Sequence, residues 1–151
     1  MKAKPVLVAT VSTLFSTVCS LATAQDIAFN PGQFKFTRNP ATGSEIAPVM
    51  GDARQPGTFI VRVRYPAGLK AMPHSHPNDT LVTVISGTLR YAEGTSFDET
   101  KFKDYPAGSF FVIRANVPHY EMATAPMEFQ AYGTGPIAFI FVNPKDDPKN
   151  K

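Results

Sequence analysis

The chain has 151 residues and a formal net charge of +3, from 15 basic and 12 acidic side chains. This length suits one domain with its own hydrophobic core. No run of basic residues marks a nucleic-acid-binding face, and no hydrophobic segment after the N-terminal region is long enough to span a membrane. We therefore expect neither nucleic acid nor a membrane as a partner of the mature protein.

The first 24 residues have the order of a secretory signal peptide. Lys2 and Lys4 precede a mostly apolar run at residues 6–18, and a small-x-small cleavage site ends at Ala24. A membrane anchor is the alternative, but the run is shorter than the about 20 residues of a bilayer span. Cleavage would remove the only cysteine, Cys19, and would leave 13 basic and 12 acidic side chains. The prediction is a periplasmic or secreted protein without a disulfide bond.

Residues 25–56 are rich in proline, glycine and small polar side chains, which predicts an N-terminal arm along the main domain. Phe34 and Phe36 alternate with other residues there and predict short edge strands. From residue 57 onward, β-type periodicity and regular turn residues predict strands at residues 59–65, 81–86, 88–92, 101–105, 109–113, 119–122, 127–132 and 137–142. No long window has helical periodicity, so residues 57–142 predict a sandwich or closed barrel, followed by a polar tail at 143–151.

The chain has three histidines, and two of them form the pair His74-Ser75-His76. Residues i and i+2 of a strand project from the same face, so these two rings can share one pocket. His119, from a distant strand, would complete a metal-binding set with open positions for water or substrate. The alternative for any one of them is a buried, hydrogen-bonded side chain without a ligand.

The spacing around these histidines is that of two known motifs. The first motif is matched by Gly68, five residues, His74-Ser75-His76, three residues, Thr80, six residues and Gly87. Thr80 is the position at which the residue type differs. Gly108, five residues, a three-residue turn, two residues and His119 follow the second. The chain therefore resembles the cupin superfamily. The resemblance implies an all-β fold, a double-stranded β-helix or jelly-roll barrel, with His74, His76 and His119 as ligands of a divalent metal.

Three positions depart from the cupin pattern. Thr80 stands at the position of the glutamate ligand, Arg114 and Asn116 replace a Pro-x-Gly turn, and Ala123 replaces the final asparagine. Asparagine can adopt the left-handed backbone conformation of a glycine, so Asn116 is a mild change. The loss of the glutamate removes a negative charge from the ligand set. Asp79 can replace it only if the turn there is irregular.

Three neutral imidazoles suit transition metals better than Mg²⁺ or Ca²⁺, which prefer oxygen ligands. We therefore expect Fe, Zn, Ni, Mn or Cu. The alternative is that metal binding is lost and the barrel binds an organic ligand alone. Around the site, the residues predicted to contact a histidine or substrate are Thr80, Gln130, Tyr132, Tyr65, Tyr91 and Asp79. Glu121 and Glu128 are expected to be solvated.

These features predict a small-molecule partner and two classes of function. The first is a metal-dependent enzyme, of the dioxygenase, isomerase or lyase/decarboxylase type. The second is a metal-independent barrel that binds a small molecule or a sugar without chemistry, which the loss of the glutamate favours. The resemblance also implies a homodimer as one state of assembly.

Overall fold

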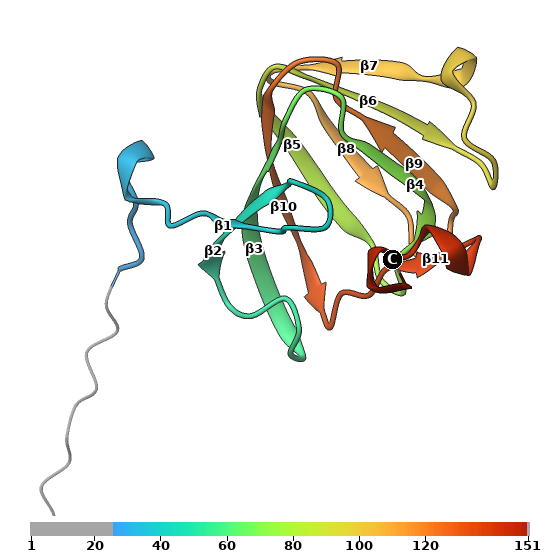
Figure 1. Cartoon of the computed structure of the whole chain (residues 1–151). Helices are drawn as coiled ribbons and strands as arrows, with labels where there is room; N and C mark the ends of the chain where they lie inside the picture. The colour runs from blue at the N-terminus through green and yellow to red at the C-terminus, as the bar shows by residue number, and fades with distance from the viewer. Residues whose placement is uncertain (1–25, 151) are drawn as a thin grey trace, which may run out of the picture.

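The computed structural model describes residues 26–150, and the predicted signal peptide lies outside these residues. The described chain is built from strands and short 3-10 turns and contains no α-helix (Figure 1). The strands are β1 (Thr37–Arg38), β2 (Glu45–Met50), β3 (Gly57–Tyr65), β4 (Lys70–Ser75), β5 (Thr80–Ser86), β6 (Thr88–Glu93), β7 (Lys103–Pro106), β8 (Phe110–Ile113), β9 (His119–Met122), β10 (Met127–Gly135) and β11 (Ile140–Phe141). The 3-10 turns are Pro31–Gln33, Glu99–Lys101, Pro144–Asp146 and Pro148–Asn150.

The strands form two antiparallel sheets. One has the order β1-β2-β3-β10-β5-β8, and the other has the order β11-β4-β9-β6-β7. Figure 1 shows the two sheets wrapped around a common interior, with the N-terminal segment extending away beyond β1 and β2. The predicted all-β double-sheet barrel is therefore confirmed. No helix in the described part of the chain is long and apolar enough to cross a membrane.

Alternating side chains of the central strands fill the barrel. In β5, Thr80, Val82 and Val84 are buried, and in β10 Phe129 and Ala131 are buried between more exposed neighbours. Successive side chains of a strand point to opposite faces, so this pattern sets one face of each sheet toward the interior. Removing a side chain the size of valine or phenylalanine from water contributes about 1.5–3 kcal/mol, so this face holds the two sheets together.

Two predicted elements differ from the structure. Phe34 and Phe36 lie before the two-residue strand β1, where their rings pack under Arg62 and Arg64 at 4.8 and 3.7 Å from guanidinium carbon to ring centroid. A cation over an aromatic face is favourable, and it attaches this segment without a long strand. At the other end, the strand expected over residues 137–142 is limited to Ile140–Phe141.

Candidate metal centre

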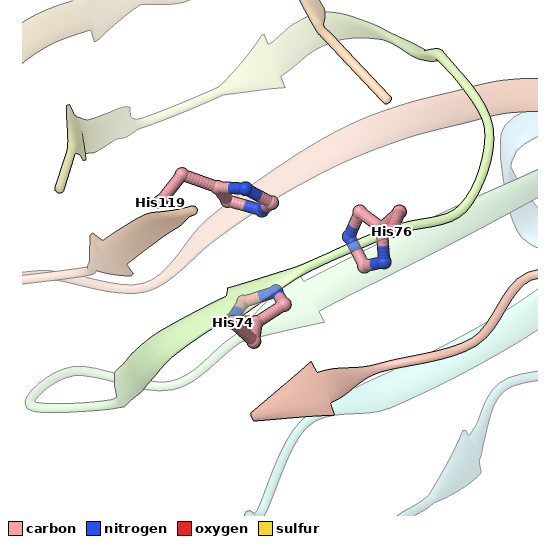
Figure 2. A group of neighbouring side chains, drawn as sticks. All are labelled: His74, His76 and His119. Atoms are coloured by element: carbon pink, nitrogen blue, oxygen red, sulfur yellow. The ribbon is translucent and has the colours of Figure 1, made fainter. Parts of the chain in front are cut away.

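Two neighbouring strands bring the three histidines together. His74 lies in β4, His76 follows the end of that strand, and His119 is the first residue of β9, directly opposite His74. The ring centroids are 4.4 Å apart for His74 and His119, 5.0 Å for His74 and His76, and 5.1 Å for His76 and His119. One nitrogen from each ring lies within 4.8 Å of the others, and all three residues are buried (Figure 2).

Backbone carbonyls fix the tautomer of each imidazole. The Nδ1 atoms of His74, His76 and His119 lie 2.7, 2.8 and 3.0 Å from the carbonyl oxygens of Met72, Ala138 and Val117. A carbonyl only accepts hydrogen bonds, so each Nδ1 carries the proton and each Nε2 keeps its lone pair. The Nε2 atom of His119 is buried and has no hydrogen-bond partner among the described residues. These observations fit a metal ion, because an imidazole ligand needs a free lone pair and a second nitrogen held in place.

The electrostatic environment keeps the rings neutral. Burial lowers the pKa of His74 to about 3, with the neighbouring His119 as the next cause. Burial also lowers the pKa of His76 and the pKa of His119, although their backbone hydrogen bonds act in the opposite direction. Protons therefore do not compete with a metal for the Nε2 atoms near neutral pH.

The turn before His119 is tied to the first motif. Asn116 has a φ of 62°, which confirms the expected left-handed conformation, and its N–H donates to the carbonyl of His76 at 2.7 Å. The carboxylate of Asp79 accepts from the Ala115 N–H at 2.7 Å and from Nη1 of Arg114 at 2.8 Å. Asp79 thus fastens the turn, and the idea that it replaces the missing glutamate at the histidines is wrong. Arg114 stands where the cupin pattern has the proline of Pro-x-Gly, and its side chain takes part in this contact with Asp79.

Thr80 faces the barrel interior and is 4% exposed. It shares its face with Val82 and Val84, in the alternation that also orients the rest of β5. Its hydroxyl brings no charge, and the histidine group in the described residues contains no carboxylate. The candidate centre therefore consists of three neutral donors.

Two of the three predicted tyrosines, Tyr65 and Tyr91, pack with the core of the barrel. The ring of Tyr91 stacks on the ring of His119, with 5.6 Å between centroids, and its buried hydroxyl has no hydrogen-bond partner in the described chain. Burial raises the pKa of Tyr91. The hydroxyl of Tyr65 donates to Oε2 of Glu121 at 2.9 Å. Tyr65 thus contacts a carboxyl group of the interior, and none of its hydrogen bonds goes to a histidine.

Glu121 was expected to be solvated, and this was wrong, because its residue is only 5% exposed. It follows His119 by two positions in β9, so it shares the interior face. Burial raises the pKa of the carboxyl group, and the hydrogen bond from Tyr65 opposes that rise. The signal that could have found it is the two-residue spacing from a histidine assigned to the interior.

Gln130 and Tyr132 were expected near the site, and the structure contradicts this for both. They alternate in β10 with Phe129 and Ala131, which belong to the buried core. Their side chains therefore leave the opposite, outer face of the sheet. There Oε1 of Gln130 accepts from Nε of Arg62 at 3.1 Å.

The segment before β11 covers the site from outside. The ring of Phe139 lies 4.7 Å from that of His76 and 5.0 Å from that of His74, between centroids, although Phe139 itself is 55% exposed. The preceding residue, Ala138, accepts the hydrogen bond from His76. This short segment therefore both orients one histidine and limits the access of water.

Fold and site together define a double-stranded β-barrel with a three-histidine centre. The family model for the cupin domain matches residues 61–132, the part that contains all three histidines. The chain belongs to the cupin superfamily, as its motif spacing predicted.

A curated relative, germin-like protein 1-1 of Oryza sativa subsp. japonica, is 30% identical over 127 residues, which are 78% of this chain and 53% of that protein. The chain thus spans about half the length of this relative. Among solved structures, the polyketide cyclase RemF of Streptomyces resistomycificus has a TM-score of 0.63 and 12% identity, with 81% and 90% of the two chains covered. A candidate acetylacetone dioxygenase of Methylibium petroleiphilum has a TM-score of 0.62 and 17% identity, with 84% and 88% covered. At these identities the structural likenesses show the fold.

Proposed function

We propose that the protein holds one divalent transition metal, Fe, Zn, Ni, Mn or Cu, through the Nε2 atoms of His74, His76 and His119, and uses it on a small organic molecule. The observation that carries this proposal is the hydrogen-bonding pattern that the three clustered rings share, each with its Nδ1–H bonded to a backbone carbonyl. A histidine buried only for packing has no need to keep a free lone pair directed at two other free lone pairs.

Each surrounding residue has a definable role. The carbonyls of Met72, Ala138 and Val117 hold the protonated nitrogens, so the donor atoms are preorganised before any ligand arrives. Phe139 and the barrel wall restrict water. When bound, the metal supplies Lewis acidity or, if it is iron or copper, a site for dioxygen. The carboxyl group of Glu121 and the hydroxyl of Tyr91 are two of the interior polar groups that can receive or position a proton.

The reaction class that we propose is oxygenation, isomerisation or lyase-type chemistry. Support comes from the site, which has no more than three protein donors, and from the neighbours in fold, one described as a candidate dioxygenase and one as a cyclase. An open coordination sphere is what these reactions share.

Metal analysis of the untagged mature protein tests the proposal. We expect about one equivalent of a transition metal per chain and its loss in His74→Ala. Ser75→Ala is the matched control, because Ser75 lies between the two histidines but projects from the other face of β4. Full metal content in His74→Ala, or loss in both variants alike, would overturn the ligand assignment.

A second candidate function is a binding barrel that works without metal. The neutral Thr80 at the glutamate position favours it, since a ligand set without a carboxylate binds metal less strongly. This candidate predicts that ligand binding is unchanged by a chelator and by His74→Ala. Binding that disappears with the metal would exclude it.

We also propose that the protein is exported, to the periplasm or the medium. The support is the order of basic, apolar and small residues in the first 24 positions. N-terminal sequencing of the protein from its native compartment should begin at Gln25. An intact Met1 in the cytoplasm would overturn this.

A further inference from the structure

Two phenylalanines of the C-terminal segment stand on the histidine side of β11. This two-residue strand lies at the edge of the five-stranded sheet, beside β4, and pairs Phe141 with His74 (Figure 1). Directly opposed residues project from the same face of a sheet, so Phe141 shares the face of His74. Phe139 precedes Phe141 by two positions, and its ring lies 6.5 Å from that of Phe141 between centroids. The inner side of this segment is therefore aromatic.

Both phenylalanine rings contact the candidate metal centre. The ring of Phe139 lies 4.7 Å from that of His76 and 5.0 Å from that of His74, between centroids. The ring of Phe141 lies 5.7 Å from that of His74. Aromatic rings attract one another at centroid distances of about 4.5–7 Å. Two ligand rings and two phenylalanine rings thus form one continuous aromatic cluster.

Phe139 connects this cluster to solvent. His74, His76 and His119 are 1%, 4% and 0% exposed, whereas Phe139 is 55% exposed. Neither of two depressions in the described surface, of about 510 and 260 Å³, has a histidine in its lining. A half-exposed side chain that also contacts two buried ligand rings lies where a molecule from solvent would meet the centre.

The backbone beside Phe139 is held in place by hydrogen bonds. The N–H of Ile137 donates to the carbonyl of Ala53 at 2.7 Å, and the carbonyl of Ala138 accepts from Nδ1 of His76 at 2.8 Å. Exposed side chains change rotamer within picoseconds to nanoseconds, while such backbone contacts persist. Rotation of the Phe139 side chain would therefore uncover His76 without breaking the hydrogen bond that fixes its tautomer.

We propose that Phe139 is the entrance residue of the centre and determines its substrate class: an aromatic ring of the substrate stacks on the ring of Phe139 while the reacting group lies at the histidines. Buried area alone does not distinguish an aromatic ring from a saturated ring of the same size, but stacking on a phenylalanine does. The assignment of this contact to a substrate rests on the proposed metal-dependent function. The role of Phe139 in access to the histidines rests on its contacts and exposure alone.

Modification of the metal-free protein with diethyl pyrocarbonate tests the access. This reagent acylates a neutral imidazole nitrogen, and mass spectrometry of peptides locates the modified histidine. We expect Phe139→Ala to raise the rate of modification at His74 and His76 several-fold. Phe110→Ala is the matched control and should leave the rate unchanged. Phe110 is 54% exposed but lies in β8, and its ring contacts no histidine ring in the described chain.

Benzyl alcohol and cyclohexylmethanol, which differ in the aromaticity of the ring, test the substrate class. Two-dimensional amide NMR measures their binding to metal-free and to zinc-loaded protein. We expect both alcohols to shift the amide signals of Phe139 and Phe141, with benzyl alcohol as the tighter ligand. In Phe139→Leu, which keeps an apolar side chain without a ring, the ratio of the two affinities should fall about fivefold, the loss of one aromatic contact. In Phe110→Leu the ratio should stay unchanged.

The outcomes separate this proposal from the proposed function. An aromatic preference that is lost in Phe139→Leu, in protein that never retains metal, would support the entrance and overturn the metal-dependent function. One equivalent of metal together with equal affinity for the two alcohols would overturn the substrate class alone. Unchanged histidine modification in Phe139→Ala, or an equal increase in Phe110→Ala, would overturn the role of Phe139 in access.

Discussion

Replacing Tyr65 by phenylalanine removes the one side-chain hydrogen bond that the buried carboxyl group of Glu121 makes among residues 26–150. In Tyr65→Phe the ring remains packed against Phe129, 5.2 Å away between centroids, while Oε2 of Glu121 loses its 2.9 Å partner. An interior polar group without a partner costs about 1–3 kcal/mol. Small domains are stable by about 5–15 kcal/mol, so this is a large fraction of the total.

Urea unfolding of the metal-free protein measures the loss. With a slope of about 1–3 kcal/mol per molar urea, the midpoint should fall by roughly 1 M. Tyr132→Phe is the control, because Tyr132 lies on the outer face of β10 and its hydroxyl makes no hydrogen bond in the described chain. Its midpoint should stay within the about 0.5 kcal/mol scatter of surface substitutions.

The destabilisation caused by Tyr65→Phe should also increase as the pH rises. The folded pKa of Glu121 is raised by burial, so its contribution to stability is present below its unfolded pKa and is lost as the pH rises through the folded pKa. Tyr65→Phe raises that pKa further, so the destabilisation should grow with pH. A loss independent of pH, or equal to that of Tyr132→Phe, would refute the buried pair as described.

Three other predictions follow from the site. Zinc at 100 times its Kd should raise the free energy of unfolding by about 2.7 kcal/mol, and His119→Ala should abolish this increment in thermal unfolding. The folded pKa of His74 lies below its unfolded value, so the metal-free protein should lose stability as the pH falls from about 6.5 toward 3. The loss should be smaller in His74→Gln, and urea midpoints of both proteins at pH 7 and pH 5 would measure it. Asn116→Gly should keep the stability of the native protein, whereas Asn116→Val should cost about 1–2 kcal/mol and weaken zinc binding in calorimetry, because φ is 62° there and the turn positions His119.

The sequence predicted most of the strands because their apolar residues alternate, but it did not predict β4 from periodicity. That strand contains Pro73, and its pairing with β9 is irregular between Ala71 and His74. Its existence depends on β9 and β11 on either side, and pairing between distant segments leaves no local pattern. The histidine pair was found through motif spacing.

The wrong predictions for β10 and β9 have one physical cause: in each strand, the side chains expected to face the interior and those expected to face outward were assigned to the wrong faces. In β10 the bulky Tyr132 points out and the small Ala131 points in, because Ala131 lies opposite Val61 and Val82 in the packed interior. In β9 the side chain of Glu121 points into the barrel because it lies two residues after His119, on the same face of the strand, and accepts a hydrogen bond from Tyr65. Polarity predicts the wrong face wherever packing space or a hydrogen bond from another sheet outweighs it.

The neutral residue at position 80 has two opposing consequences for the proposed centre. A threonine there removes a negative donor and weakens metal binding, but it leaves the charge of a bound metal free to attract an anion. Binding of metal and binding of anion are then coupled, and the coupling is reciprocal, since each must raise the affinity for the other by the same factor. Glu121 does not break this coupling, because it lies outside the histidine group and its carboxyl is engaged by Tyr65. A barrel of this kind would therefore hold its metal most firmly when an anionic ligand is also bound.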